Sequence, residues 1–215
     1  MYFKKEKKRL NKHLFQFSNS VEKQVSYAIQ ALSDVDITLS KRIVKANVVI
    51  GHSSVEIEEE CLKLLALYQP VANDLRLIIS VLKINGDLER IGDHAVIIAE
   101  EVSKMVALEP IDVPNCLYEL SALAKIMLRK SLLGFVESDI QVAEDVLLQN
   151  KTLKELTDEV NSYEILAIKD NVETLEQHLS ILNIARQIQR IADHAIHIAE
   201  DTSYLMKGEI IRHNG

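Results

Sequence analysis

The chain has 215 residues, of which 47% are hydrophobic and 27% charged, and it carries a net charge of −7. Its six Gly and three Pro are too few for the frequent turns of a β-sandwich or a dinucleotide-binding α/β fold. We therefore expect an all-α protein. The sequence also lacks an apolar run of about 18 residues and the apolar core of a signal peptide, so we expect the protein to lie in the cytoplasm and not to span a membrane.

A basic segment, residues 1–12, opens the chain with six Lys or Arg side chains against one Glu. The rest of the protein is therefore strongly acidic, which argues against a nucleic-acid partner because phosphate backbones bind basic surfaces. We expect the basic segment to be a solvated terminus that frays. Contact with an anionic membrane surface or an acidic partner is the alternative.

Apolar residues in the first half of the chain predict three helices. From Leu14 to Ile43 they recur every three or four positions, which is the spacing of one long amphipathic helix. A second helix is expected at about residues 48–67. A third follows Pro70, a residue that suits the first turn of a helix, and runs to about Ala107.

The second half predicts three helices in the same order, after a linker at residues 109–114. Glu173 follows Asp170 by three positions, and this spacing suggests a capping box at the start of the last helix. The expected bounds of the three helices are about 117–147, 150–169 and 171–207.

The two halves of the chain repeat each other. Residues 88–100 are identical to residues 188–200 at eight of thirteen positions, and residues 36–50 align with residues 139–153. A tandem duplication explains both alignments. We therefore expect a pair of three-helix bundles, with a basic arm at 1–12, the first repeat at 13–109 and the second repeat at 113–208.

The third helix of the first repeat has an acidic face. At about 100° per residue, Asp93 and Glu100 lie within about 40° of Glu89, opposite a stripe of apolar residues. Two carboxylates four positions apart can share one hard cation, so Glu89 and Asp93 are candidate metal ligands. A solvated surface helix has the same pattern and is the alternative.

The corresponding face of the second repeat carries Gln189, Asp193, His197 and Glu200. Asp193 and His197 are four positions apart, a spacing that lets a carboxylate and an imidazole bind one transition-metal ion. The two acidic faces are therefore predicted to differ in their ligands.

His94 and His194 lie at the edge between the acidic and apolar stripes. We interpret them as partly buried residues held by neighbouring side chains. A phosphate-accepting histidine of a phosphorelay bundle is the less favoured alternative. The sequence has no phosphate-binding loop, metalloprotease motif or nucleophile motif, so we do not expect an enzyme.

Motifs typical of one family occur at residues 69–77 (Gln-Pro-Val-Ala-Asn-Asp-Leu-Arg-Leu), at 87–95 (Asp-Leu-Glu-Arg-Ile-Gly-Asp-His-Ala) and again at 189–195 (Gln-Arg-Ile-Ala-Asp-His-Ala). With these motifs the chain resembles the PhoU family of phosphate-uptake regulators over residues 10–208. The resemblance implies two three-helix repeats in a cytosolic and often dimeric protein. It also implies iron, zinc or another divalent metal at Glu/Asp-x-x-x-Asp faces.

Carried over by position, the family motif implies metal at Glu89 and Asp93 in the first repeat. In the second repeat only Asp193 matches, because Gln189 replaces the acid. Asn47 also stands where related sequences often carry Asp. These departures imply fewer metal ions or weaker metal binding. The full set of candidate ligands is Glu89, Asp93, Glu100, Asp193, His197 and Glu200.

The resemblance also implies a function. The family represses the phosphate-starvation response through contact with the phosphate ABC transporter and its sensor histidine kinase. We therefore expect a homodimeric regulator that acts by binding. Two alternatives stay open, namely an accessory protein of a sodium- or proton-coupled phosphate permease and a metal-dependent phosphatase-type enzyme.

Overall fold

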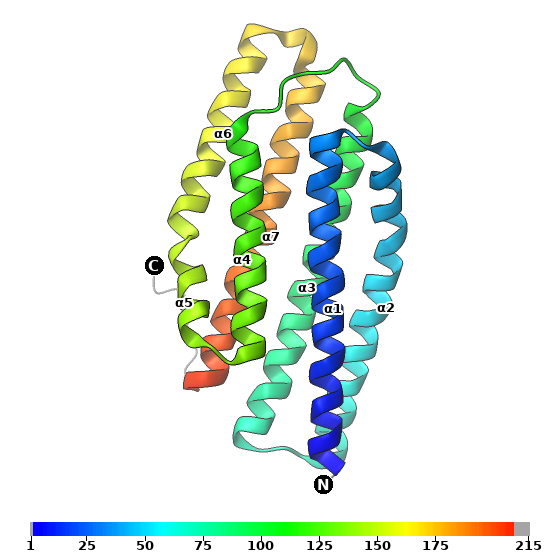
Figure 1. The fold of residues 1–215 in the computed structure, drawn as a ribbon, viewed down its shortest axis with the longest axis vertical. Coiled ribbons are helices and arrows are strands. Elements are labelled where there is room, and N and C mark those ends of the chain that lie inside the picture. Colours follow the sequence, from blue (N-terminus) through cyan, green and yellow to red (C-terminus); the bar gives the residue numbers. More distant parts are fainter. Residues whose placement is uncertain (1, 209–215) are drawn as a thin grey trace.

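The computed structural model describes residues 2–208, and within that range it contains helices and no strand. The helices are α1 (Tyr2–Asp34), α2 (Ile37–Tyr68), α3 (Ala72–Met105), α4 (Asn115–Glu137), α5 (Ile140–Leu148), α6 (Asn150–Asp170), the short η1 (Val172–Thr174) and α7 (Leu175–Lys207). The first repeat (α1 to α3) and the second repeat (α4 to α7) lie side by side, and the helices of both run along the long axis of the molecule (Figure 1). The expected all-α fold is confirmed.

The first helix ends earlier than the sequence predicts. The expected single helix from Leu14 to Ile43 is wrong, because the chain reverses at Val35, whose φ is 50°. Asp36 then caps α2, and its Oδ1 accepts hydrogen bonds from the backbone N–H of Thr38 (2.8 Å) and of Leu39 (3.0 Å). The apolar spacing continues through the turn because both helices face one core.

The second repeat reverses in the same way, so the expected helix at 117–147 is also wrong. Ser138 takes a φ of 55°, and Asp139 caps α5 by accepting from the N–H of Gln141 at 2.9 Å. α5 and α6 meet at Gln149, and together they occupy the place that α2 has in the first repeat. The expected helix at 150–169 is confirmed as α6.

The start of α7 differs from the expected capping box. Asp170 is the last residue of α6, and the side chain of Asn171 accepts the N–H of Glu173 at 3.0 Å to cap η1. α7 therefore begins only at Leu175. Its end is as predicted, because Gly208 follows with a left-handed φ of 75°.

The basic segment is helical in the structure. Residues 2–12 form the first turns of α1, which corrects the expectation of a frayed terminus, and residue 1 lies outside the described residues. Lys7 Nζ lies 2.7 Å from Asp74 Oδ1, and Arg9 Nε lies 2.8 Å from Glu60 Oε1. The basic segment is thus held against α2 and α3 by ion pairs.

The core follows α3 and α7, which run antiparallel and contact each other along their length (Figure 1). On each helix a fully buried Ile recurs every seven residues, as in a coiled coil. These are Ile84, Ile91 and Ile98 on α3 and Ile184, Ile191 and Ile198 on α7. Each such side chain contributes about 1.5–3 kcal/mol through burial.

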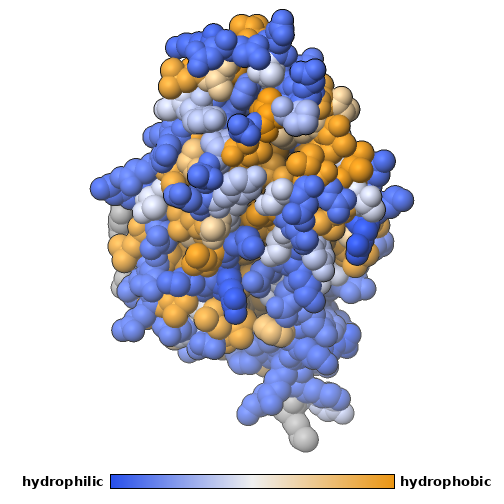
Figure 2. All heavy atoms as spheres, turned by 45° about the horizontal axis from the view of Figure 1, so that its top comes forward, coloured by the Kyte–Doolittle hydropathy of each residue, from blue (hydrophilic) through white to orange (hydrophobic). Residues whose placement is uncertain are grey.

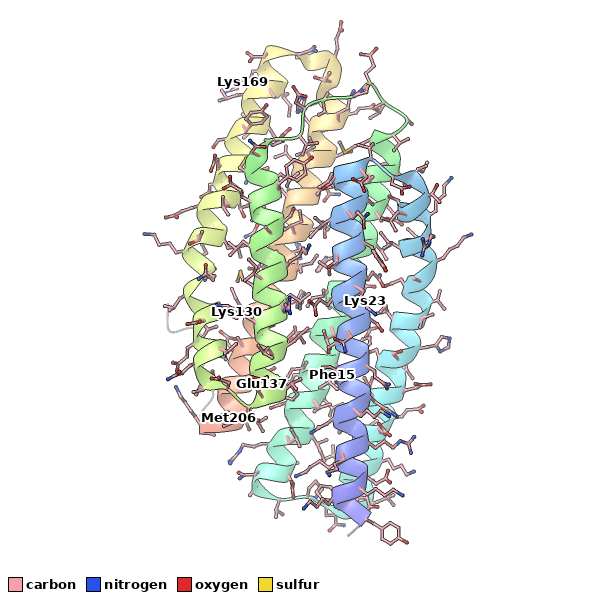
Figure 3. The ribbon with its side chains drawn as sticks, in the orientation of Figure 1. Phe15, Lys23, Lys130, Glu137, Lys169 and Met206 are labelled. Carbon is pink, nitrogen blue, oxygen red and sulfur yellow. The ribbon has the colours of Figure 1, made fainter. Side chains whose placement is uncertain are left out.

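The surface is mixed in polarity. Figure 2 shows polar side chains over most of one face, with apolar patches between them. Lys23 on α1 is exposed, and Lys130 Nζ on α4 lies 3.2 Å from Asp145 Oδ2 of α5 (Figure 3). Across residues 2–208, no helix combines the length and apolar character needed to cross a lipid bilayer.

Candidate functional site

The contact between α3 and α7 joins the two repeats, and we call it the seam. Residues 100 apart are equivalent in the two repeats, and two of the polar contacts across the seam occur in related pairs. Lys83 Nζ lies 2.7 Å from Asp201 Oδ1, and the equivalent Asn183 donates to Glu101 Oε1 at 2.9 Å. The seam therefore has approximate twofold symmetry.

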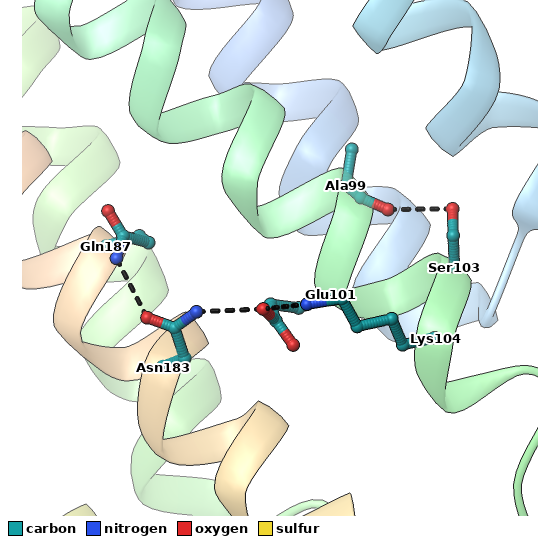
Figure 4. Close-up of polar contacts among 6 residues, drawn as sticks. All are labelled: Ala99, Glu101, Ser103, Lys104, Asn183 and Gln187. Carbon is teal, nitrogen blue, oxygen red and sulfur yellow. Dashed lines mark hydrogen bonds and ion pairs between the residues drawn. The ribbon is translucent and has the colours of Figure 1, made fainter.

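Glu101 is the hub of one of these contacts (Figure 4). Its Oε1 accepts from Asn183 and lies 2.8 Å from Lys104 Nζ, while Gln187 donates to Asn183 at 3.0 Å. Burial acts to raise the pKa of Glu101, but these donors outweigh it and hold the pKa below its usual value. The carboxylate thus stays charged at a mostly buried position.

Two histidines stack at the centre of the seam. The rings of His94 and His194 have centroids 5.5 Å apart and an interplanar angle of 30°. His94 Nδ1 lies 2.9 Å from Gln187 Oε1, and His194 Nδ1 lies 2.8 Å from Asp87 Oδ1. Both histidines are half-buried, which confirms the expectation of partly buried residues held by neighbours.

The two symmetry-related corners of the seam differ in chemistry. One corner has Asp87 and His197 where the other has Gln187 and Ile97. His197 Nδ1 lies 3.4 Å from Asp87 Oδ1, and its ring meets the ring of His194 edge-on at 5.5 Å. Only the first corner therefore combines a carboxylate with two imidazoles.

The electrostatics of this corner follow from the contacts. Burial pushes the pKa of Asp87 upward, but the hydrogen bonds from His194 and His197 outweigh it and lower the pKa. The hydrogen bond to Asp87 raises the pKa of His197. Burial lowers the pKa of His94, whose Nδ1 faces the neutral side chain of Gln187. Within residues 2–208, Asp87, His194 and His197 form the one group of His, Cys, Asp or Glu side chains close enough to share an ion.

The acidic face of the first repeat lies against α2. Glu89 accepts a hydrogen bond from Ser54 Oγ at 2.9 Å, and Asp93 accepts one from Asn47 Nδ2 at 3.0 Å. Gln24 of α1 in turn donates to Asn47 Oδ1 at 3.0 Å. These two carboxylates accept hydrogen bonds from neutral donors, and Arg90 Nη1 lies 3.9 Å from Asp93 Oδ2. No third acidic ligand joins them among the described residues. A metal ion at Glu89 and Asp93 stays a prediction and fits these residues poorly.

A glycine permits the close approach of α2 to this face. A Cβ on Gly92 would lie 2.9 Å from Ile50 Cγ2 and 3.3 Å from Asn47 Oδ1. The carbonyl of Gly92 also accepts from Gln24 Nε2 at 3.2 Å. Gly92 therefore allows the chain of hydrogen bonds from Gln24 through Asn47 to Asp93.

Among the described residues, Asp193, Glu100 and Glu200 do not join His197 in a group close enough to share an ion. Asp193 is half-buried, and burial raises its pKa. His197 lies one turn further along α7 but contacts Asp87 of α3. Glu100 is exposed and Glu200 is half-buried. The predicted pairing of Asp193 with His197 on one ion stays a prediction.

Sequence reasoning missed Asp87 and a buried pair in the second repeat. Asp87 joins the histidines only because α3 and α7 pack antiparallel, although its replacement by Gln187 in the other copy was visible. The buried pair consists of Glu164 and His178, with 2.6 Å between Oε2 and Nδ1. Glu164 is 0% exposed, and burial raises its pKa.

Comparison with known proteins decides the family. The model of the PhoU domain matches residues 14–102 and 117–202, one segment in each repeat. The chain belongs to the PhoU family. A relative from Pseudomonas putida, described as a phosphate-specific transport system accessory protein PhoU homolog, is 32% identical over 99% of this chain and 84% of the relative. The PhoU homolog of Aquifex aeolicus is 30% identical over 97% of this chain and 95% of the relative.

Solved PhoU structures share the fold. The crystal structure of PhoU from Pseudomonas aeruginosa superposes with a TM-score of 0.93 at 31% identity, covering 96% of this chain and 100% of that chain. The PhoU structure from Streptococcus pneumoniae, described as a phosphate transport system regulatory protein, gives a TM-score of 0.90 at 27% identity, covering 98% and 99% of the two chains. The paired three-helix repeats of this chain are therefore those of PhoU.

Proposed function

We propose that this chain regulates phosphate uptake by binding the phosphate ABC transporter and its sensor histidine kinase in the cytoplasm, and that it represses the phosphate-starvation response. The observation that carries the proposal is similarity over nearly the full chain to proteins described as phosphate-specific transport system accessory proteins. Such a role needs differential binding to two states of the partner and no catalytic step.

The surface chemistry supports a binding role. The excess of acidic side chains lies outside the basic segment. An acidic surface of this kind favours binding to basic partner surfaces. Val48 and Val49 on α2 are 65% and 64% exposed. Exposed apolar side chains of this kind support self-association, and we include a homodimer in the proposal.

The proposal is tested by capturing a tagged full-length chain from its own cells grown in high and in low phosphate. We expect to recover subunits of the transporter and the sensor kinase, with an amount that changes with phosphate. Recovery of neither partner under both conditions would overturn the proposed regulation.

A pair of charge reversals sharpens the test. Glu100→Lys alters the exposed acidic face of α3, and we expect it to reduce partner recovery. Glu137→Lys makes the same change at an exposed position at the end of α4 (Figure 3) and serves as the matched control. Equal recovery with both variants would remove the acidic face from the proposal.

A further inference from the structure

We propose that Asp87, His194 and His197 bind one divalent transition-metal ion at the seam between the two repeats. Zn²⁺ serves as the test ion in the experiments below. This inference goes beyond the regulatory role and does not rest on it. It also differs from the acidic faces, because its ligands come from α3 and α7 together and include two imidazoles.

The distances among the three side chains fit such an ion. Asp87 Oδ1 lies 2.8 Å from His194 Nδ1 and 3.4 Å from His197 Nδ1, and the three ligand atoms lie within 4.8 Å of one another. Zinc bonds of about 2.0–2.1 Å in a tetrahedron place ligand atoms roughly 3.3 Å apart. Small side-chain rotations would therefore admit the ion without movement of either helix.

The ligand types select the class of metal. Two imidazoles and one carboxylate suit Zn²⁺ and its first-row neighbours, whereas Mg²⁺ and Ca²⁺ prefer oxygen ligands alone. The side chain of His197 is 55% exposed, while those of Asp87 and His194 are 15% and 21% exposed. The ion would thus reach the site from solvent on the His197 side, and a fourth position would be open to water.

Carboxylates that act on His197 favour a cation at the site. The carboxylates of Asp193 and Glu200 act electrostatically on His197 and add negative charge around the site. Lys83 of the same seam is already 2.7 Å from Asp201. The ring of His94 stacks on His194 and restricts its orientation. An ion here would be held by ligands from both repeats and would tie α3 to α7.

The opposite corner of the seam supplies an internal control. It carries Gln187, His94 and Ile97 in the positions of Asp87, His194 and His197, so it lacks the carboxylate and one imidazole. Because the opposite corner holds Gln and Ile at the equivalent positions, Asp87→Gln and His197→Ile are changes that the fold already tolerates in equivalent places. The proposal therefore predicts one ion per chain.

The experiment uses the full-length chain, stripped with a chelator and then titrated with Zn²⁺ alone. We expect one Zn²⁺ per chain, a higher midpoint of thermal unfolding when Zn²⁺ is bound, and ligand-field absorption bands when Co²⁺ replaces Zn²⁺. Asp87→Gln and His197→Ile should each weaken binding at least about 10-fold. The unfolding midpoint of each metal-free variant verifies that it folds.

Two further variants make the result decisive. Asp93→Asn leaves the seam intact and should bind Zn²⁺ as the wild type does. The double variant Gln187→Asp, Ile97→His builds the missing ligands into the opposite corner and should bind a second ion. Unchanged Zn²⁺ affinity in folded Asp87→Gln and His197→Ile, loss of binding in Asp93→Asn, or no Zn²⁺ binding by the wild type would each overturn the proposal.

Discussion

His194 on α7 and Asp87 on α3 bind each other across the two repeats, with 2.8 Å between Nδ1 and Oδ1. The related pair of His94 and Gln187 lies at 2.9 Å on the other side of the approximate twofold axis. The same backbone arrangement thus gives one histidine a carboxylate partner and the other an amide partner, which makes the seam a matched comparison within a single molecule.

Replacing the two acceptors, Asp87 and Gln187, should have unequal effects on stability. Asp87→Ala removes a charged acceptor of two histidines and should lower the free energy of unfolding of the metal-free protein by about 1.5–3 kcal/mol. Gln187→Ala removes a neutral acceptor and should cost about 0.5–1.5 kcal/mol. Urea unfolding of both variants measures the difference, and an equal or larger loss in Gln187→Ala would contradict it.

Two glycines inside α3 should respond to alanine in opposite directions. At Gly92 the new Cβ would lie 2.9 Å from Ile50 Cγ2, so Gly92→Ala should destabilise the protein by about 1–3 kcal/mol through overpacking. A Cβ at Gly86 meets nothing within 4 Å, so Gly86→Ala should stabilise it by about 0.5–1 kcal/mol. Thermal and urea unfolding measure both changes in stability. Stabilisation by Gly92→Ala would contradict the close approach of α2 to Gly92.

The buried Glu164 should give stability a dependence on pH. Burial raises its pKa in the folded state, so its contribution to stability is full below the unfolded pKa and declines as pH rises through the folded pKa. Glu164→Gln removes this decline. The free energy of unfolding of the variant should therefore improve relative to the wild type between pH 4 and pH 7, values chosen around the ordinary Glu pKa of about 4.3.

The control for Glu164 is its exposed neighbour Glu159. His178 of α7 is bonded to Glu164, and the titratable thiol of Cys116 on α4 interacts with Glu164 electrostatically. Glu159→Gln should leave the pH profile of urea unfolding unchanged. A relative loss of stability in Glu164→Gln as pH rises would refute the raised pKa.

The helix cap at Asp36 should contribute more to the free energy of unfolding than its exposed neighbour Asp34 does. Asp36→Ala removes the acceptor of the Thr38 and Leu39 N–H groups and should cost about 1 kcal/mol. Asp34 is exposed, and its carboxylate accepts a hydrogen bond from Gln30 at 3.3 Å. Asp34→Ala should therefore change the free energy of unfolding by less than about 0.5 kcal/mol, and comparable losses in the two variants would contradict the cap.

The sequence predicted the fold from two signals, the helical spacing of apolar residues and the internal repeat. It did not reveal the turns at Val35 and Ser138, because neither turn uses Gly or Pro and the apolar spacing continues across both. A signal was present, since Asp36 and Asp139 begin the aligned segments of the two repeats. Recognising them as N-caps would have divided both long helices correctly.

The candidate site was predicted less completely. The spacing of Glu89 and Asp93 placed them on one helix face, but their hydrogen bonds to Ser54 and Asn47 depend on how α2 packs. His197 was paired with a residue of its own helix because periodicity describes one helix at a time. Its contact with Asp87 exists only after α3 and α7 have packed.

The most direct test of the metal-binding seam is an anomalous difference map at the zinc absorption edge, from crystals of the full-length chain grown with Zn²⁺. The proposed site predicts one strong peak per chain in contact with Asp87 Oδ1 and the imidazoles of His194 and His197. A peak at Glu89 and Asp93 instead, or no peak at the seam in crystals that contain Zn²⁺, would contradict it.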